Sequence, residues 1–108
     1  MYTIIDNKKI DIKVAVTKYE KIKGLMFKNN IKYGLFIPNC VSVHTFFMQD
    51  NIDILVLNEN NEVLYKFQNT SKNKIIEVKE DINKTSILEL PKNTSNNVFI
   101  GDKINFYL

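Results

Sequence analysis

Apolar and polar residues alternate within the stretch from His44 to Leu57, the longest apolar-rich run in the chain. Residues 52 to 57 combine β-branched side chains with a period of two, which predicts a strand buried on at least one face. Residues 44 to 48 predict another strand, separated from the first by a short polar break. A polar turn at 58 to 61 and a further apolar run at 63 to 67 then predict a central hairpin.

The N-terminal part of the chain predicts a hairpin followed by the main helix. Two apolar, β-branched runs within residues 2 to 16 are split by a polar turn, which is a hairpin signal. Thr17-x-x-Glu20 is a capping box, in which each side chain satisfies the other residue's backbone amide at the start of a helix. Apolar residues then recur at spacings of three and four, so we expect a helix over about residues 18 to 27. Gly24 would lie inside this helix, where it indicates the close approach of a strand or a ligand.

Short apolar runs separated by polar turns continue to the C-terminus. They predict further strands at 34 to 37, 75 to 78, 85 to 90 and 104 to 108. Many short strands with one helix favour an α+β, mainly β fold, namely a curled antiparallel or barrel-like sheet packed with one main helix. A chain of 108 residues has the size of one domain, so we expect residues 1 to 108 to form a single domain.

The charge pattern argues against nucleic acid as a partner. The 15 basic residues are all lysines, so the guanidinium fork that grips guanine or phosphate through two hydrogen bonds is missing. The lysines are also scattered instead of lying in a stripe with aromatic residues. No apolar run has the length of a membrane span, and the N-terminus lacks the pattern of a secretory signal. We therefore expect no membrane partner and a cytoplasmic location, which the lone Cys40 also fits.

Four short motifs stand in a distinctive order: Ala15-Val16-Thr17 with Glu20 and Gly24–Phe27, Gly34-Leu35-Phe36, His44–Met48 with Ile52-Asp53-Ile54, and Leu88–Pro91 followed by Gly101–Ile104. With these motifs the chain resembles, over nearly its whole length, the bacterial and archaeal family called domain of unknown function 192. The resemblance implies a small, compact domain rich in β-structure with one main helix. It implies no established reaction. Gln49 stands where similar sequences often carry a basic residue, which argues against an anionic ligand there.

Cys40 and His44 are the only cysteine and histidine in the chain. Four residues along a strand or loop do not bring two side chains together as four along a helix do. A zinc site needs three or four ligands, so we expect no metal and no cofactor. Two interpretations stay open: a nucleophile with its base, or a buried cysteine beside a histidine that hydrogen-bonds to a carbonyl or carboxylate.

Four carboxylates are candidates for acid–base chemistry, namely Glu20, Asp53, Glu89 and Asp102. Glu20 has a structural alternative as a helix cap, and Asp102 has one as part of a turn. Asp53 and Glu89 interrupt apolar strands, where a polar group needs a hydrogen-bond partner or must border a cleft.

We therefore expect a non-enzymatic binding or protein-interaction module with a shallow cleft between the helix and the central strands. Its partner would be an unknown protein or small molecule, and the chain would be a monomer or weak homodimer. The alternative is a small hydrolase-like enzyme that uses His44 with a carboxylate. We expect His44 to lie within hydrogen-bonding reach of a polar group and to share a cluster with at least one of Glu20, Asp53 and Glu89. The candidate ligand-binding residues are Glu20, Met26, Cys40, His44, Thr45, Phe47, Met48, Asp53 and Glu89.

Overall fold

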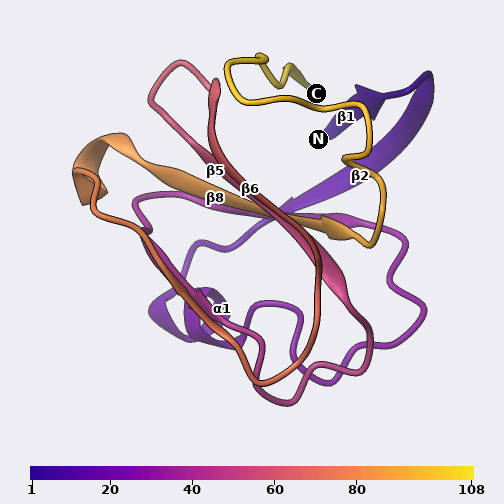
Figure 1. Cartoon of the computed structure of the whole chain (residues 1–108), viewed down its shortest axis with the longest axis vertical. Helices are drawn as coiled ribbons and strands as arrows, with labels where there is room; N and C mark the ends of the chain where they lie inside the picture. Colours follow the sequence, from indigo (N-terminus) through magenta and orange to yellow (C-terminus); the bar gives the residue numbers. More distant parts are fainter.

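Short strands dominate the fold in the computed structural model, which describes residues 1–108 (Figure 1). In chain order the elements are β1 (Tyr2–Ile5), β2 (Lys8–Val14), α1 (Lys18–Lys23), β3 (Gly34–Ile37), β4 (Ser42–His44), β5 (Ile52–Leu57), β6 (Val63–Thr70), β7 (Ile75–Glu77), a 3-10 turn η1 (Ile82–Lys84), β8 (Ser86–Pro91) and β9 (Phe106–Tyr107). The prediction of a mainly β fold is thus confirmed. None of the helices has the length and apolar character needed to cross a bilayer.

The main sheet is open and mixed, so the prediction of a barrel-like or wholly antiparallel sheet is wrong. Its order is β6-β5-β8-β3-β2-β1-β9, and its edge strands β6 and β9 do not pair with each other. The strands β2 and β3 run parallel, with Ile12 opposite Gly34. Parallel neighbours need a crossover connection, and the segment that contains α1 supplies it. Alternation along the chain does not reveal which strands become neighbours.

Both predicted hairpins are confirmed. The strands β1 and β2 pair antiparallel around Asp6 and Asn7, whose φ angles of 52° and 62° suit the tight turn of such a hairpin. The strands β5 and β6 form the central hairpin. The strand predicted at 44 to 48 is wrong except at His44, because β4 spans Ser42–His44 and residues 45 to 48 are not in a strand. The strand β4 pairs with β7 in a separate two-stranded ribbon.

Thr45 is the physical reason for the early end of β4. Its hydroxyl donates to the Ser71 carbonyl at 2.8 Å and accepts from the Lys74 amide at 2.8 Å. The residue is therefore fully buried against the loop between β6 and β7. Two residues later, Phe47 has a φ of 60°, which leaves the extended region altogether.

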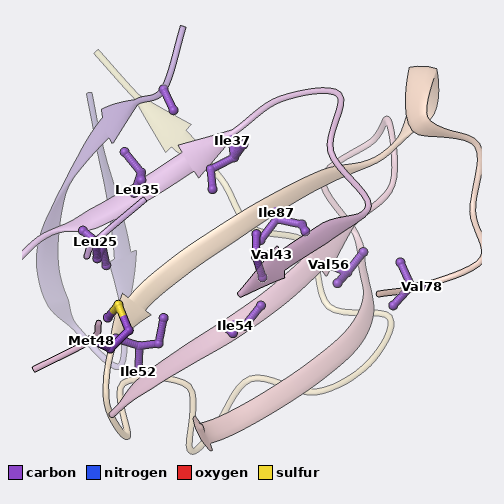
Figure 2. Packing of buried hydrophobic residues seen from close by; sticks show 11 residues of the cluster. Leu25, Leu35, Ile37, Val43, Met48, Ile52, Ile54, Val56, Val78 and Ile87 are labelled. Atoms are coloured by element: carbon purple, nitrogen blue, oxygen red, sulfur yellow. The ribbon is translucent and has the colours of Figure 1, made fainter. Parts of the chain in front are cut away.

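The strand β5 is buried on both faces and separates two hydrophobic clusters. Its even-numbered residues 52, 54 and 56 belong to the first cluster, and Leu55 and Leu57 belong to the second. In the first cluster, Val43 of β4 and Val78, just after β7, pack over the sheet (Figure 2). The β4–β7 ribbon is thereby fixed on one face of the main sheet.

The helix begins as predicted and ends earlier than predicted. The Thr17 hydroxyl accepts from the Glu20 amide at 3.1 Å, and the Glu20 carboxylate accepts from the Thr17 amide at 2.9 Å. The helix stops before Gly24, not near residue 27, because Gly24 has φ 51° and ψ −130°, far from helical values. None of the helical residues is buried, and Ile22 is 59% exposed. The apolar stripe of α1 therefore does not face the core.

Asp53 ties the end of β6 and the loop after β8 to the middle of the sheet. Its Oδ1 accepts from the amides of Asn69 at 2.8 Å and Asn93 at 2.9 Å. Its Oδ2 accepts from the Ser95 amide at 2.9 Å and also from the Ser95 hydroxyl. The side chain is fully buried, and these bonds replace the water that a carboxylate loses on burial. Asp53 therefore has a structural role, joining the end of β6 to the loop after β8.

Thr17→Ala should destabilise the protein by about 1 kcal/mol, because the Glu20 amide loses its acceptor at the start of α1. Thr17→Ser keeps the hydroxyl and is the matched control. The measurement is the midpoint of urea unfolding for the three proteins. Equal midpoints would show that the cap contributes nothing.

Asp53→Ala should cost about 3 kcal/mol or more, because three backbone amides lose their acceptor inside the protein. Asp11→Ala removes a carboxylate from an exposed position of β2 and should stay within about 0.5 kcal/mol of the parent. Urea unfolding of both variants measures the difference. Similar losses in the two would contradict the anchoring role.

Candidate functional site

A cleft of about 390 Å³ opens between α1 and the β4–β7 ribbon. This volume lies within the range of small-molecule sites. The helix and its cap contribute Lys21, Ile22 and Gly24; the segment around β4 contributes Cys40, Ser42, Val43, His44 and Phe46; Ile75 comes from β7 and Glu89 from β8. The cleft therefore lies on the face of the sheet that carries the first hydrophobic cluster.

Glu89 is the buried polar residue of this cleft. Its partners across the neighbouring strands are Leu35 of β3 and Ile54 of β5, both members of the first cluster. Its Oε1 has no hydrogen-bond partner. Burial raises the pKa of Glu89 to about 7, and the backbone amide of Leu25 offsets only part of the rise. The carboxyl group therefore keeps its proton to a much higher pH than an exposed glutamate does.

Gly24 closes over the Glu89 carboxyl group. A Cβ atom at this position would stand 3.0 Å from Oε1 of Glu89, and the φ of 51° disfavours any residue with a side chain. The sequence prediction that Gly24 allows a close approach is therefore confirmed. The approaching group is a side chain of β8, and the glycine is the C-terminal cap of α1 instead of an interior residue.

His44 lines the same cleft as Glu89. This confirms the prediction that His44 shares a cluster with at least one of the three candidate carboxylates. Nδ1 of His44 accepts from the Phe46 amide at 3.3 Å, which fulfils the expected contact with a polar group. Its ring stacks on the Phe46 ring, with the centroids 5.1 Å apart. No hydrogen bond joins His44 to Glu89 or to Cys40, so the geometry contains no preformed catalytic pair.

Cys40 carries a protonated thiol in this environment. Burial raises the pKa of the thiol, and the nearby Glu89 charge raises it further. The thiol donates to the Ser42 carbonyl at 3.2 Å. Because the thiolate is the nucleophilic form of cysteine, Cys40 is not activated. No group of three or more His, Cys, Asp or Glu side chains gathers closely enough to hold a metal ion.

Three candidates from the sequence lie outside this cleft and have structural contacts. Glu20 caps the helix, and its bond with the Thr17 amide holds the pKa of the Glu20 carboxyl below its usual value. Thr45 holds the loop before β7, and Asp53 anchors the end of β6 and the loop after β8. The polar positions of the central strands therefore do not form one connected site.

Two of the remaining candidates, Phe47 and Met48, line a second surface hollow together with Phe27. Phe27 and Phe47 are 61% and 62% exposed, and their rings stack with centroids 5.5 Å apart. Both have positive φ angles, 64° and 60°, which are uncommon for aromatic residues. Met48 is buried in the first cluster, and Met26 is half-buried. None of these residues lines the cleft of Glu89.

The sequence prediction missed the apolar rim of the cleft, chiefly Ile22, Val43 and Ile75. Ile22 belongs to the apolar stripe of the predicted helix, and Ile75 belongs to a predicted strand. Spacing alone does not separate a stripe that packs inward from one that borders a cleft. The one available signal was Gly24, whose partner Glu89 lies 65 positions away along the chain.

The family model of DUF192, described as uncharacterized ACR, matches residues 1–106. A UPF0127 protein of Thermococcus sibiricus (strain DSM 12597 / MM 739) is 34% identical over 59 residues, a match that covers 49% of this chain and 38% of that relative. The chain therefore spans well under two thirds of the length of this relative.

Two crystal structures share the fold. One is a protein of unknown function from Novosphingobium aromaticivorans DSM 12444, with a TM-score of 0.80 and 16% identity over 97% of this chain and 82% of that one. The other is a candidate transcription regulator from Sinorhizobium meliloti 1021, with a TM-score of 0.78 and 16% identity over 96% of this chain and 89% of that one. At such low identity the likeness concerns the fold alone.

Glu89→Gln should change the pH dependence of stability. The raised pKa of Glu89 means that the native state binds its proton more tightly than the unfolded state. The contribution of the Glu89 proton to the free energy of unfolding is therefore complete below about pH 4.5 and is lost as the pH rises through about 7. It amounts to about 3 kcal/mol. Glutamine at this position carries no charge at any pH and should remove this loss.

Urea unfolding of both proteins between about pH 4.5 and pH 8 measures this effect. The quantity to compare is the difference between the two stabilities, because other titrating groups contribute equally to both proteins. A difference that stays constant over this range would show that Glu89 has an ordinary pKa.

Proposed function

The chain belongs to the DUF192 family, as its sequence motifs indicated, and we propose that it is a binding module whose ligand occupies the cleft between α1 and the β4–β7 ribbon. The observation that carries the proposal is the carboxyl group of Glu89, which is buried at an apolar cleft with Oε1 unpartnered. A buried polar group without a partner costs free energy. A ligand with a matching polar group can recover that free energy.

The walls of the cleft support a ligand with an apolar body. Ile22 and Ile75 remain 59% and 65% exposed at its rim. Val43 and Phe46 continue the apolar lining between them. Exposed apolar surface gains free energy when a ligand excludes water from it. A mostly apolar lining with a few polar groups is the usual composition of a small-molecule site.

The alternative, a hydrolase-like enzyme that uses His44, has weaker support. General acid–base catalysis needs the histidine and its carboxylate within hydrogen-bonding reach. Nδ1 of His44 instead accepts from the Phe46 amide, and the raised pKa of the Cys40 thiol disfavours a thiolate nucleophile. These contacts favour binding over catalysis.

The test is an NMR titration of ¹⁵N-labelled protein with benzyl alcohol, a small neutral probe that has an apolar ring and one hydroxyl. We expect millimolar binding, with amide shifts concentrated at the residues that line the cleft, such as Ile22, Gly24 and Ile75. Shifts scattered over the surface, or none at all, would contradict a binding site here.

Two matched variants localise the probe. Ile75→Ser removes apolar surface from the rim of the cleft and should weaken binding about threefold to tenfold. Ile100→Ser removes the same side chain from a position that is 70% exposed and outside the cleft, and it should leave binding unchanged. Equal effects of the two substitutions would exclude the cleft as the binding site.

A further inference from the structure

The cleft holds a buried carboxyl group that lacks a countercharge. Burial is the main influence on the pKa of Glu89, and no neighbouring cation offsets it. The one ammonium group that lines the cleft belongs to Lys21, which is half-buried on α1. The charge of Lys21 acts on the Cys40 thiol instead. The ionised form of Glu89 is therefore left uncompensated.

We propose that the ligand is a small organic ammonium, an apolar body that carries one protonated amine directed at Glu89 from inside the cleft. The inference rests on the proposed function, because it names the ligand class of the same site. A volume of about 390 Å³ limits the ligand to a small molecule.

The donor chemistry supports this class. An ionised carboxylate only accepts hydrogen bonds, and an ammonium group only donates them, so the two are complementary. Such charge-assisted bonds are stronger than neutral ones, and a low local dielectric strengthens them further. The Phe46 ring in the lining also favours a cation, because the face of an aromatic ring carries partial negative charge.

Other ligand classes match the cleft less well. A neutral alcohol can form one hydrogen bond with Glu89 but does not stabilise its ionised form. An anion is repelled by ionised Glu89 and can bind only after the carboxyl group takes up a proton. The protonation state of Glu89 therefore distinguishes the three classes, since each responds differently to pH.

The other titratable groups at the cleft are few. They are Lys21 on α1 and, around β4, Cys40 and His44. The neighbouring strands β3 and β5 place only the apolar residues Leu35 and Ile54 opposite Glu89. Because histidines in general change charge near neutral pH, His44 needs its own control in any test of pH dependence.

The experiment compares benzylamine, benzyl alcohol and benzoate, which share a ring and differ in the polar group. NMR titrations at about pH 6 and about pH 8 give the dissociation constants. Benzylamine should bind most tightly at about pH 8 and about tenfold more weakly at about pH 6, where Glu89 must lose its proton first. Benzyl alcohol should have similar dissociation constants at the two pH values. Benzoate should bind better at the lower pH.

Calorimetry of the unchanged protein provides a second readout that needs no variant. Benzylamine binding at about pH 6 should release nearly one proton, seen as a heat that depends on the ionisation enthalpy of the buffer. Glu89→Gln should abolish both the proton release and the preference for benzylamine over benzyl alcohol. His44→Gln should keep both. Lys21→Gln should also keep both, because no neighbouring cation offsets the charge of Glu89.

The outcomes separate this inference from the proposed function. If benzyl alcohol maps to the cleft but benzylamine binds no more tightly at about pH 8, or without proton release, the ammonium proposal is wrong and the binding module stands. If none of the three probes maps to the cleft, both fail. Nα-acetyl-lysine amide distinguishes the source of the ammonium, since tighter binding than benzylamine would point to a protein side chain and overturn the small-molecule ligand.

Discussion

Burial of β5 and β8 on both faces is the constraint on which the structure depends. All the residues of β5 are buried, and those of β8 from Ile87 to Leu90 are buried as well. A polar side chain at one of these buried positions must find a partner inside the protein or remain unpaired at a cost in free energy. The two carboxyl groups placed here, Asp53 and Glu89, meet this constraint in opposite ways.

Asp53 accepts from three backbone amides and a hydroxyl, which the end of β6 and the loop after β8 supply. Glu89 has an unpartnered oxygen and a pKa raised to about 7. A carboxylate with all its hydrogen bonds made has a structural role in the fold. A carboxyl group with an unpartnered oxygen at a cleft is instead a candidate for binding a ligand. This contrast singles out Glu89, and not Asp53, as the candidate for function.

The local features of the fold were predictable from the sequence, and the long-range ones were not. The capping box at Thr17 and the two hairpins depend on neighbouring residues, so short motifs revealed them. At Gly24, where α1 ends, the close neighbour is Glu89, which comes from a distant strand. The pairing of β4 with β7 depends on Thr45 and its contacts with a later loop. Such pairings leave no periodic trace in the sequence.

The candidate site follows the same division. The motifs marked His44 and Glu89 as odd polar residues, but only the fold brings them to one cleft. Asp53 and Glu89 are both buried, so only their hydrogen bonds distinguish the fully bonded Asp53 from Glu89, whose Oε1 has no partner.

The polar group of the cleft comes from a buried strand, whereas the walls come from elements that are mostly exposed. Glu89 lies in the middle of the main sheet, between β3 and β5. The walls come from α1, which buries none of its residues, and from a ribbon of two three-residue strands. Substitutions at Ile22 or Ile75 can therefore reshape the cleft with little effect on the core, whereas a change at Glu89 acts on both. If the cleft binds the ligand that we propose, this arrangement permits the shape of that ligand to vary while its polar anchor stays fixed.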